Sequence, residues 1–212
     1  MNKTLIAAAL CTLMAAPSLA LASGDLIVNG SFEATAQAIN TWKIYQTVPG
    51  WETVSPVAGS GIEVRHNVAG TAFHGKNFVE LDGNKGPGNT TMAQTITTQN
   101  GQLYDLRFFY SARPGFTDVA SNGIMVAWNG VDLLPELTGA GTSQHDWMEV
   151  SRQVMGTGSD VLSFRATGLN DSYGGSLDNV SLTAAVPEPG TYALMVAGLL
   201  AVGFIARRRK AD

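Results

Sequence analysis

The chain has 212 residues, 14% of them charged, a net charge of -4 and one cysteine, so a disulfide scaffold is excluded and a packed core is expected. Residues 23–186 contain eight Lys and Arg against fifteen Asp and Glu, which gives this middle part a net charge of -7. Such an acidic surface repels phosphate backbones, so nucleic acid is excluded as an expected partner.

Residues 1–22 have the pattern of a secretory signal peptide. Lys3 precedes an apolar run from Leu5 to Ala16, and the small-residue site Ala20-Leu21-Ala22 follows it. This order predicts export and cleavage after Ala22, because the apolar run is too short for a membrane anchor. Cys11 lies inside this segment, so we expect a mature chain without cysteine.

Residues 23–186 are long enough for one domain with a full core, and their periodicity is that of strands. One face of residues 103–110 is aromatic or apolar: Tyr104, Leu106, Phe108 and Tyr110. Ile124, Val126 and Trp128 alternate in the same way, and the Asn129-Gly130 that follows favours a type I′ hairpin.

Further strands are expected at residues 78–81, 92–97, 147–154, 161–166 and 177–183, with Gly, Asn, Asp and Pro clusters between them. Outside the two ends, no segment has the pattern of an amphipathic helix. Many short strands of this kind predict an all-β fold, an antiparallel β-sandwich or jelly roll, flanked by a signal-peptide helix and a C-terminal hydrophobic helix.

Patterns typical of catalysis are absent from the sequence. The three histidines are scattered without the spacing of a zinc site, and no nucleophile elbow or phosphate-binding loop is present. Acid pairs for glycoside cleavage could be drawn from Glu63, Glu80 and Asp82, although fifteen acids make some pairing inevitable. We therefore predict no catalytic residues.

Three short segments resemble the opening and closing motifs of galactose-binding-like β-sandwiches. They are Val28-Asn29-Gly30-Ser31-Phe32-Glu33, Pro49-Gly50-Trp51-Glu52 and Tyr173-Gly174-Gly175-Ser176-Leu177-Asp178. The domain is similar to DUF642 cell-wall proteins and to carbohydrate-binding modules of the xylan and glucan type. That resemblance implies a β-sandwich of this family.

The resemblance also implies a structural calcium ion held by Glu33 and Asp178, which match acidic positions near the first and last strands of such modules. Carboxylate oxygens are suitable ligands for a hard cation, and the ion would tie the two ends of the domain together. The alternative is that Glu33 is a solvated strand residue and that Asp178 bonds its own backbone in a turn.

Three residues are candidates for binding a sugar. Trp51 and Tyr173 lie in Gly-rich loops and could stack on a sugar ring, whereas packing beneath the loop is the alternative. Arg113 aligns with an arginine of the DUF642 pattern, and its planar fork could hold sugar hydroxyls or a uronic carboxylate. Its alternative role is a surface ion pair with an acid.

The tail at residues 187–212 has three parts: Pro187-Glu188-Pro189, an apolar run at 191–206, and the basic cluster of Arg207, Arg208 and Arg209. It is similar to the PEP-CTERM sorting signal of Gram-negative bacteria, which implies cutting by exosortase, a membrane protease. Before processing, the apolar helix is expected to lie in the inner membrane. A plain tail anchor is the alternative, although sixteen residues span only about 24 Å.

These features together predict an exported protein of the cell surface or matrix whose β-sandwich binds carbohydrate, most simply an extracellular polysaccharide. A structural surface or biofilm protein without glycan binding is a second hypothesis. A polysaccharide hydrolase is a third.

Overall fold

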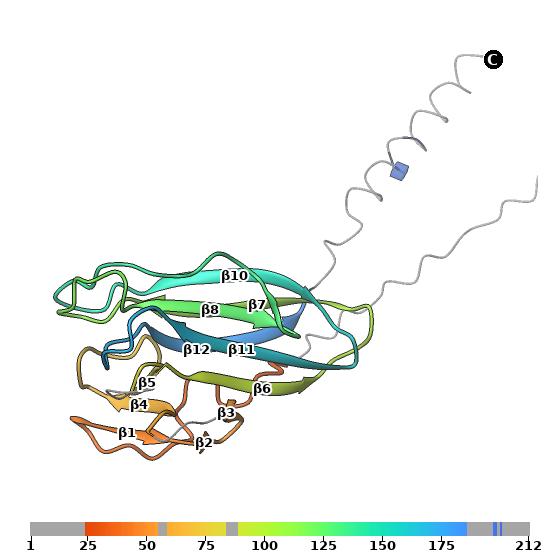
Figure 1. The fold of residues 1–212 in the computed structure, drawn as a ribbon. Helices are drawn as coiled ribbons and strands as arrows, with labels where there is room; N and C mark the ends of the chain where they lie inside the picture. The colour runs from red at the N-terminus through yellow and green to blue at the C-terminus, as the bar shows by residue number, and fades with distance from the viewer. Residues whose placement is uncertain (1–23, 55–58, 84–88, 186–196, 199, 201–212) are drawn as a thin grey trace, which may run out of the picture.

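The structure, a computed structural model, describes residues 24–54, 59–83, 89–185, 197, 198 and 200, and these form a sandwich of two antiparallel sheets (Figure 1). Sheet A has the order β1-β4-β5-β12-β7-β10, with bounds Thr41–Tyr45, Ile62–His66, Asn77–Glu80, Ser176–Ala184, Leu103–Ser111 and Met148–Met155. Sheet B has the order β2-β3-β6-β11-β8-β9, with bounds Thr47–Val48, Trp51–Val54, Thr91–Thr97, Ser159–Thr167, Gly123–Trp128 and Val131–Asp132. Every strand pair is antiparallel, which confirms the predicted all-β sandwich.

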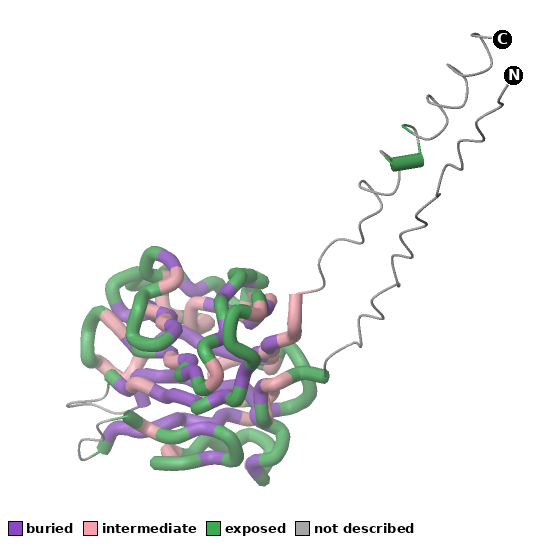
Figure 2. Tube along the Cα trace, turned by 90° about the vertical axis from the view of Figure 1, so that its right-hand side faces the viewer, coloured by how far each residue is buried: buried purple, intermediate pink, exposed green. Residues whose placement is uncertain are grey.

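The core lies between the inner faces of the two sheets, and buried positions alternate along the longer strands (Figure 2). In β7, the four predicted inward residues are all at most 4% exposed, while Arg107 between them faces out. Phe108 of sheet A meets Phe164 of sheet B edge to face, with ring centroids 5.1 Å apart. The strict period of two therefore lets each sheet bury one face against the other.

Turn chemistry explains the β8–β9 connection. Asn129 and Gly130 both have positive φ, at 52° and 78°, as the predicted type I′ turn requires. The Asn129 side chain accepts a bond from the Val161 amide and donates to Asp160, so this turn is also fixed to β11.

The segment before β1 has no regular strand and is held by side-chain amides instead. Gln94 on β6 both accepts from the Val28 amide and donates to the Val28 carbonyl, so it pairs with the backbone as a strand partner does. Asn77 on β5 donates to the carbonyls of Phe32 and Thr35. These contacts join residues 27–35 to both sheets.

β12 runs next to β7 along the whole sandwich and defines its two ends. Tyr173 precedes its first residue, Ser176, and Ala185 follows its last, Ala184. Ala185 donates its amide to Leu103 at the start of β7, and Leu26 donates to Leu182, so the first and last segments of the domain meet at one end.

Two groups of predictions remain outside this description. The signal-peptide helix lies at residues that the structure does not describe, and of the expected C-terminal helix only residues 197, 198 and 200 are described. Among the described residues, no helix is both long enough and apolar enough to cross a membrane. The flanking helices and the domain boundaries therefore stay predictions.

Candidate functional site

Four charged side chains are packed together on the outer face of sheet A. In β4, Ile62 and Val64 point into the core, so the alternation of the strand directs Glu63 and Arg65 to the opposite face. Glu63 is the direct cross-strand partner of Glu80 on β5, which places two carboxyl groups side by side. Two carboxyl groups this close are costly unless a cation lies between them or one of them is protonated.

Two arginines supply that positive charge. Arg65 pairs with Glu63 at 2.5 Å through Nη2 and with Glu80 at 3.1 Å through Nε. Arg113, in the loop after β7, donates through Nη1 to Glu80 at 2.5 Å and to the Ser172 carbonyl at 3.1 Å. We call Glu63, Arg65, Glu80 and Arg113 the Arg–Glu cluster.

Most of the Arg–Glu cluster is inaccessible to water. The side chains of Glu63 and Arg65 are at most 5% exposed and that of Glu80 is fully buried, whereas Arg113 is 16% exposed. Burial raises the pKa of Glu63 to about 8, against the opposing effect of Arg65, and also raises the pKa of Glu80. Arg113 is thus the accessible edge of a buried ionic network.

A third buried acid, Asp82, ties the neighbouring loop to β5. Its Oδ2 accepts the amides of Asp171 and Ser172, at 3.0 and 3.1 Å. Burial raises the pKa of Asp82 to about 6, and the nearby Asp171 charge adds to this rise. The same loop donates the Gly174 amide to Glu80, so the 171–174 turn is fixed by two carboxyl groups.

The raised pKa of Glu63 predicts a specific pH dependence of stability. A carboxyl group whose pKa is higher in the folded than in the unfolded state stabilises the fold below about pH 4.5, and this contribution is lost as the pH rises through about 8. We expect Glu63→Gln to make the urea midpoint of the full chain less sensitive to pH over that interval, with its advantage over the wild type greatest at about pH 9. A constant offset between the two proteins from about pH 5 to 9 would contradict this assignment.

Aromatic side chains flank the Arg–Glu cluster on both sides. Trp42 on β1 is the cross-strand partner of Arg65, whose Cζ lies 6.0 Å from the indole centroid, and Trp42 is 51% exposed. On the other side, Arg113 Cζ lies 4.7 Å from the Tyr173 ring centroid, and Phe116 stacks on Tyr173 at 4.1 Å. A continuous chain of contacts therefore runs from an exposed indole to a loop tyrosine.

The structure brings together two of the three predicted sugar-binding residues. Arg113 and Tyr173 are in contact, although the Tyr173 ring is already engaged by Phe116 as well. Trp51 is elsewhere and only 2% exposed: its ring centroid lies 6.0 Å from that of Phe32 and 5.9 Å from that of Phe164. The prediction that Trp51 stacks on a ligand is wrong, because β3 directs its ring into the core between the sheets.

Trp42 is a candidate that the sequence analysis did not select. The sequence signal for strand β1 was a short alternation, Trp42-Lys43-Ile44-Tyr45, in a run without glycine after Asn40. What no local pattern showed is that β1 is the edge strand of sheet A, which is why its tryptophan stays half exposed.

Glu33 and Asp178, the predicted calcium ligands, lie on either side of the segment before β5. Glu33 Oε1 accepts the amides of Lys76 and Asn77, both at 2.7 Å, and Asp178 Oδ2 accepts the amide of His74 at 2.8 Å. Burial raises the pKa of Asp178 to about 7, and the charge of Glu33 adds to the rise. Two neighbouring carboxyl groups of this kind suit a hard cation.

A complete metal site is not formed by acidic and histidine side chains alone. Within the described ranges, no group of three or more His, Cys, Asp or Glu side chains lies close enough to hold an ion. Glu33 and Asp178 fit part of a calcium shell, and backbone oxygens or water would have to complete it.

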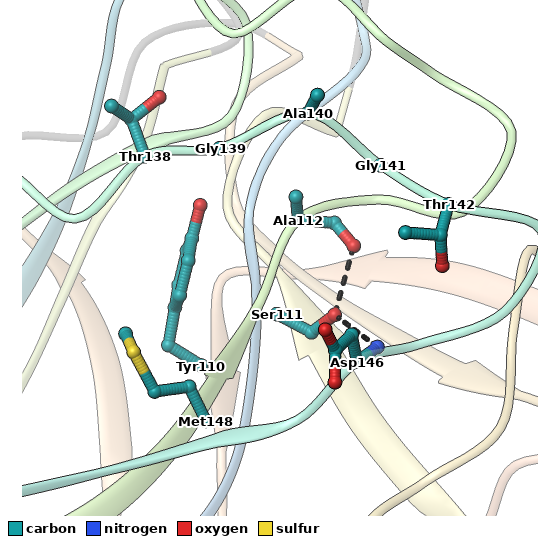
Figure 3. Close-up of a pocket in the computed structure, with 10 residues that line it drawn as sticks. All are labelled: Tyr110, Ser111, Ala112, Thr138, Gly139, Ala140, Gly141, Thr142, Asp146 and Met148. Carbon is teal, nitrogen blue, oxygen red and sulfur yellow. Dashed lines mark hydrogen bonds between the residues drawn. The ribbon is translucent and has the colours of Figure 1, made fainter.

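A small depression lies beside the loop that carries Arg113 (Figure 3). Its volume is about 190 Å³, and residues 138–142 form one wall while Tyr110, Ser111 and Met148 form another. The Ser111 hydroxyl, which donates to the Ala112 carbonyl and accepts the Asp146 amide, is already committed. Pockets for small ligands usually exceed about 300 Å³, so this depression is at most an extension of the Arg113 region.

One serine–histidine contact has the geometry of a nucleophile and its base. His145 Nε2 lies 3.1 Å from Ser176 Oγ, and His145 Nδ1 lies 2.8 Å from the Thr71 carbonyl. Ser176, however, is fully buried, and burial lowers the pKa of His145 to about 4. A substrate could not reach this hydroxyl, so we interpret the contact as a structural link to the loop before β5.

Comparison with known families identifies the tail. Residues 185–210 match the PEP-CTERM protein-sorting motif, which contains the predicted Pro187-Glu188-Pro189 and arginine cluster. This match confirms the prediction of a sorting tail and indicates a secreted protein that is sorted to the cell surface.

A curated relative covers most of the chain but is far longer than it. The chain is 30% identical over 157 residues to a multifunctional-autoprocessing repeats-in-toxin protein of Vibrio vulnificus. That alignment covers 74% of this chain and 3% of the toxin. The chain thus resembles one small portion of the toxin.

Solved structures share the fold at low identity. The K1 cleaved adhesin domain of Lys-gingipain from Porphyromonas gingivalis has a TM-score of 0.52 at 17% identity, covering 69% of this chain and 98% of that domain. The CBM22-1 xylan-binding domain from Paenibacillus barcinonensis has a TM-score of 0.50 at 14% identity, covering 79% and 98%. The chain therefore combines a β-sandwich of the kind found in adhesin and carbohydrate-binding domains with a C-terminal PEP-CTERM protein-sorting motif.

Proposed function

We propose that this protein is a non-catalytic surface protein whose sandwich binds carbohydrate across the outer face of sheet A. The observation that carries the proposal is the half-exposed indole of Trp42, held over Arg65 at one margin of the Arg–Glu cluster. An indole with an accessible face presents the flat apolar surface on which sugar rings stack, and a fixed neighbour reduces the entropy lost on binding.

Hydrogen-bonding groups for a sugar lie along the same face. Arg113 is partly exposed and is held in place by Glu80 and by the Ser172 carbonyl, so its remaining donors are oriented before any ligand arrives. The fold shared with a xylan-binding domain agrees with this use of the sandwich. Delivery to the surface would follow export by the signal peptide and processing of the tail by exosortase.

A test of the proposal removes Trp42. Trp42→Ala should weaken binding of the full chain to its glycan about tenfold to a hundredfold, because a large side chain contributes about 1.5–3 kcal/mol when it is buried by a ligand. Affinity electrophoresis in gels that contain a polysaccharide measures the change.

Met155→Ala is the matched control. Met155 is 54% exposed and ends β10, the edge strand of sheet A that lies farthest from β1, so its loss should leave migration unchanged. If Trp42→Ala binds as the wild type does, the indole is not the platform. If the wild type binds no polysaccharide, a structural role without glycan binding replaces the proposal; the internal pairing of the Arg–Glu cluster favours that second candidate.

We further propose a structural calcium ion at Glu33 and Asp178. It would offset the cost of burying the Asp178 carboxylate, which is the main cause of its raised pKa, and it would join the segment before β1 to β12. With free calcium at about 100 times its Kd, the ion should stabilise the fold by about 2.7 kcal/mol, so a chelator should lower Tm by roughly 5–10 °C.

Differential scanning calorimetry with and without chelator measures this shift. Glu33→Gln should abolish it, whereas Glu149→Gln, which removes an exposed carboxylate on β10, should preserve it. Coincident melting curves for the wild type with and without chelator would contradict the proposed calcium ion.

A further inference from the structure

We infer that the glycan bound by the outer face of sheet A is uncharged, a neutral polysaccharide with neither uronate nor sulfate groups. This inference rests on the proposed carbohydrate binding and specifies the ligand class. It decides between two uses of Arg113, a donor to sugar hydroxyls or a partner of an anionic sugar. Three features of the Arg–Glu cluster and its surroundings favour the first.

Both arginines already have carboxylate partners that they cannot give up. Arg65 bridges Glu63 and Glu80, and Arg113 holds Glu80 at 2.5 Å. Glu80 is fully buried, so an arginine that turned towards an anionic ligand would leave a carboxylate in the protein interior without compensation. An acidic sugar would have to compete with a partner that is already desolvated and in contact.

The side chains around the two arginines provide no additional positive charge for binding an anion. Glu63 and Glu80 pair with the two arginines, and a third buried acid, Asp82, accepts the amide of Ser172, whose carbonyl binds Arg113. Glu80 alone contacts both guanidinium groups, so neither arginine is without an acidic partner. Asp171 lies beside Tyr173, whose amide it accepts, and adds a negative charge at the loop margin.

The charge of the whole domain also disfavours an anionic ligand. Residues 23–186 carry eight basic and fifteen acidic side chains, so a polyanion approaches against the net field of the domain. Stacking on Trp42, by contrast, depends on contact area and ring geometry and requires no ligand charge. The contacts that remain available, an indole face and guanidinium donors to hydroxyl groups, are those that a neutral sugar uses.

The test compares neutral and acidic polymers in affinity electrophoresis of the full chain in detergent. Xylan, mannan and galactan are the neutral probes, and polygalacturonate and alginate are the acidic ones. We expect retardation by at least one neutral polymer, loss of that retardation of about tenfold or more in Trp42→Ala, and little change between about 50 and 500 mM salt.

The outcomes separate the ligand class from the proposed function. Retardation by an acidic polymer that disappears in high salt and in Arg113→Met would overturn the neutral assignment and leave carbohydrate binding intact. Arg107→Met, which removes an exposed arginine of β7, is the control for a general effect of charge. Absence of binding to every polymer would overturn both the proposed function and this inference.

Discussion

Arg65→Ala should lower the free energy of unfolding by about 3–5 kcal/mol at neutral pH, which is the usual cost of removing one partner from a buried ion pair. The side chains that lose their partner are Glu63 and Glu80, both at most 1% exposed and directly opposite each other on β4 and β5. The loss should be smaller near pH 5 than near pH 8, because burial raises the pKa of both carboxyl groups and a protonated carboxyl group carries no buried charge.

Urea unfolding of the full chain at about pH 5 and pH 8 measures the effect. Arg107→Ala is the matched control, because Arg107 is 58% exposed and lies 3.7 Å from the exposed Glu149. Exposed pairs of this kind contribute about 0–1 kcal/mol. If both substitutions cost the same, the Arg–Glu cluster is not the buried network described above.

Trp51→Ala should also cost about 3–5 kcal/mol, for a different reason. It would open a cavity between Phe32 and Phe164 and remove the indole that donates to the Asn29 carbonyl at 3.3 Å. Trp51→Phe keeps most of the volume and should recover much of the loss.

Trp42→Ala tests the same substitution at a half-exposed tryptophan, for comparison with buried Trp51. Trp42 is half exposed and touches Arg65 at its face, so its loss should cost about 1 kcal/mol or less in stability. We therefore expect loss of Trp51 to lower stability and loss of Trp42 to weaken glycan binding. A Trp51→Ala variant that keeps wild-type stability and loses glycan binding would reverse the assignment.

The longer strands could be predicted because each repeats a local pattern often enough to be recognised. Along β7, four inward residues alternate with outward ones, and Asn129-Gly130 fixes the β8–β9 hairpin by its own backbone preferences. Neither depends on a distant residue. The sorting tail could be identified for the same reason, because its three parts follow one another within residues 185–210 and form a local pattern.

The strands β1 to β4 were missed because their burial depends on distant partners. Glu63 and Arg65 look like solvent-exposed residues in sequence, and only Glu80 and Arg113 make their burial possible. Trp51 and Trp42 both sit near glycines or turns in short strands, and local sequence does not show which one lies at the edge of a sheet. Arg113 was identified by resemblance and Tyr173 by its place in a Gly-rich loop, whereas the contacts of Arg113 with buried Glu80 and with Tyr173 required the fold.

β12 sets the distance between the Tyr173 loop and the residue at which the sorting tail begins. Its nine residues, at about 3.3 Å each, separate the Tyr173 loop from Ala185 by about 30 Å. Because the sorting tail continues from Ala185, a molecule tethered there would hold Arg113 and Tyr173 at its tip, pointing outwards from the envelope. Polymer strands in the surrounding medium would then reach this end of the sandwich first.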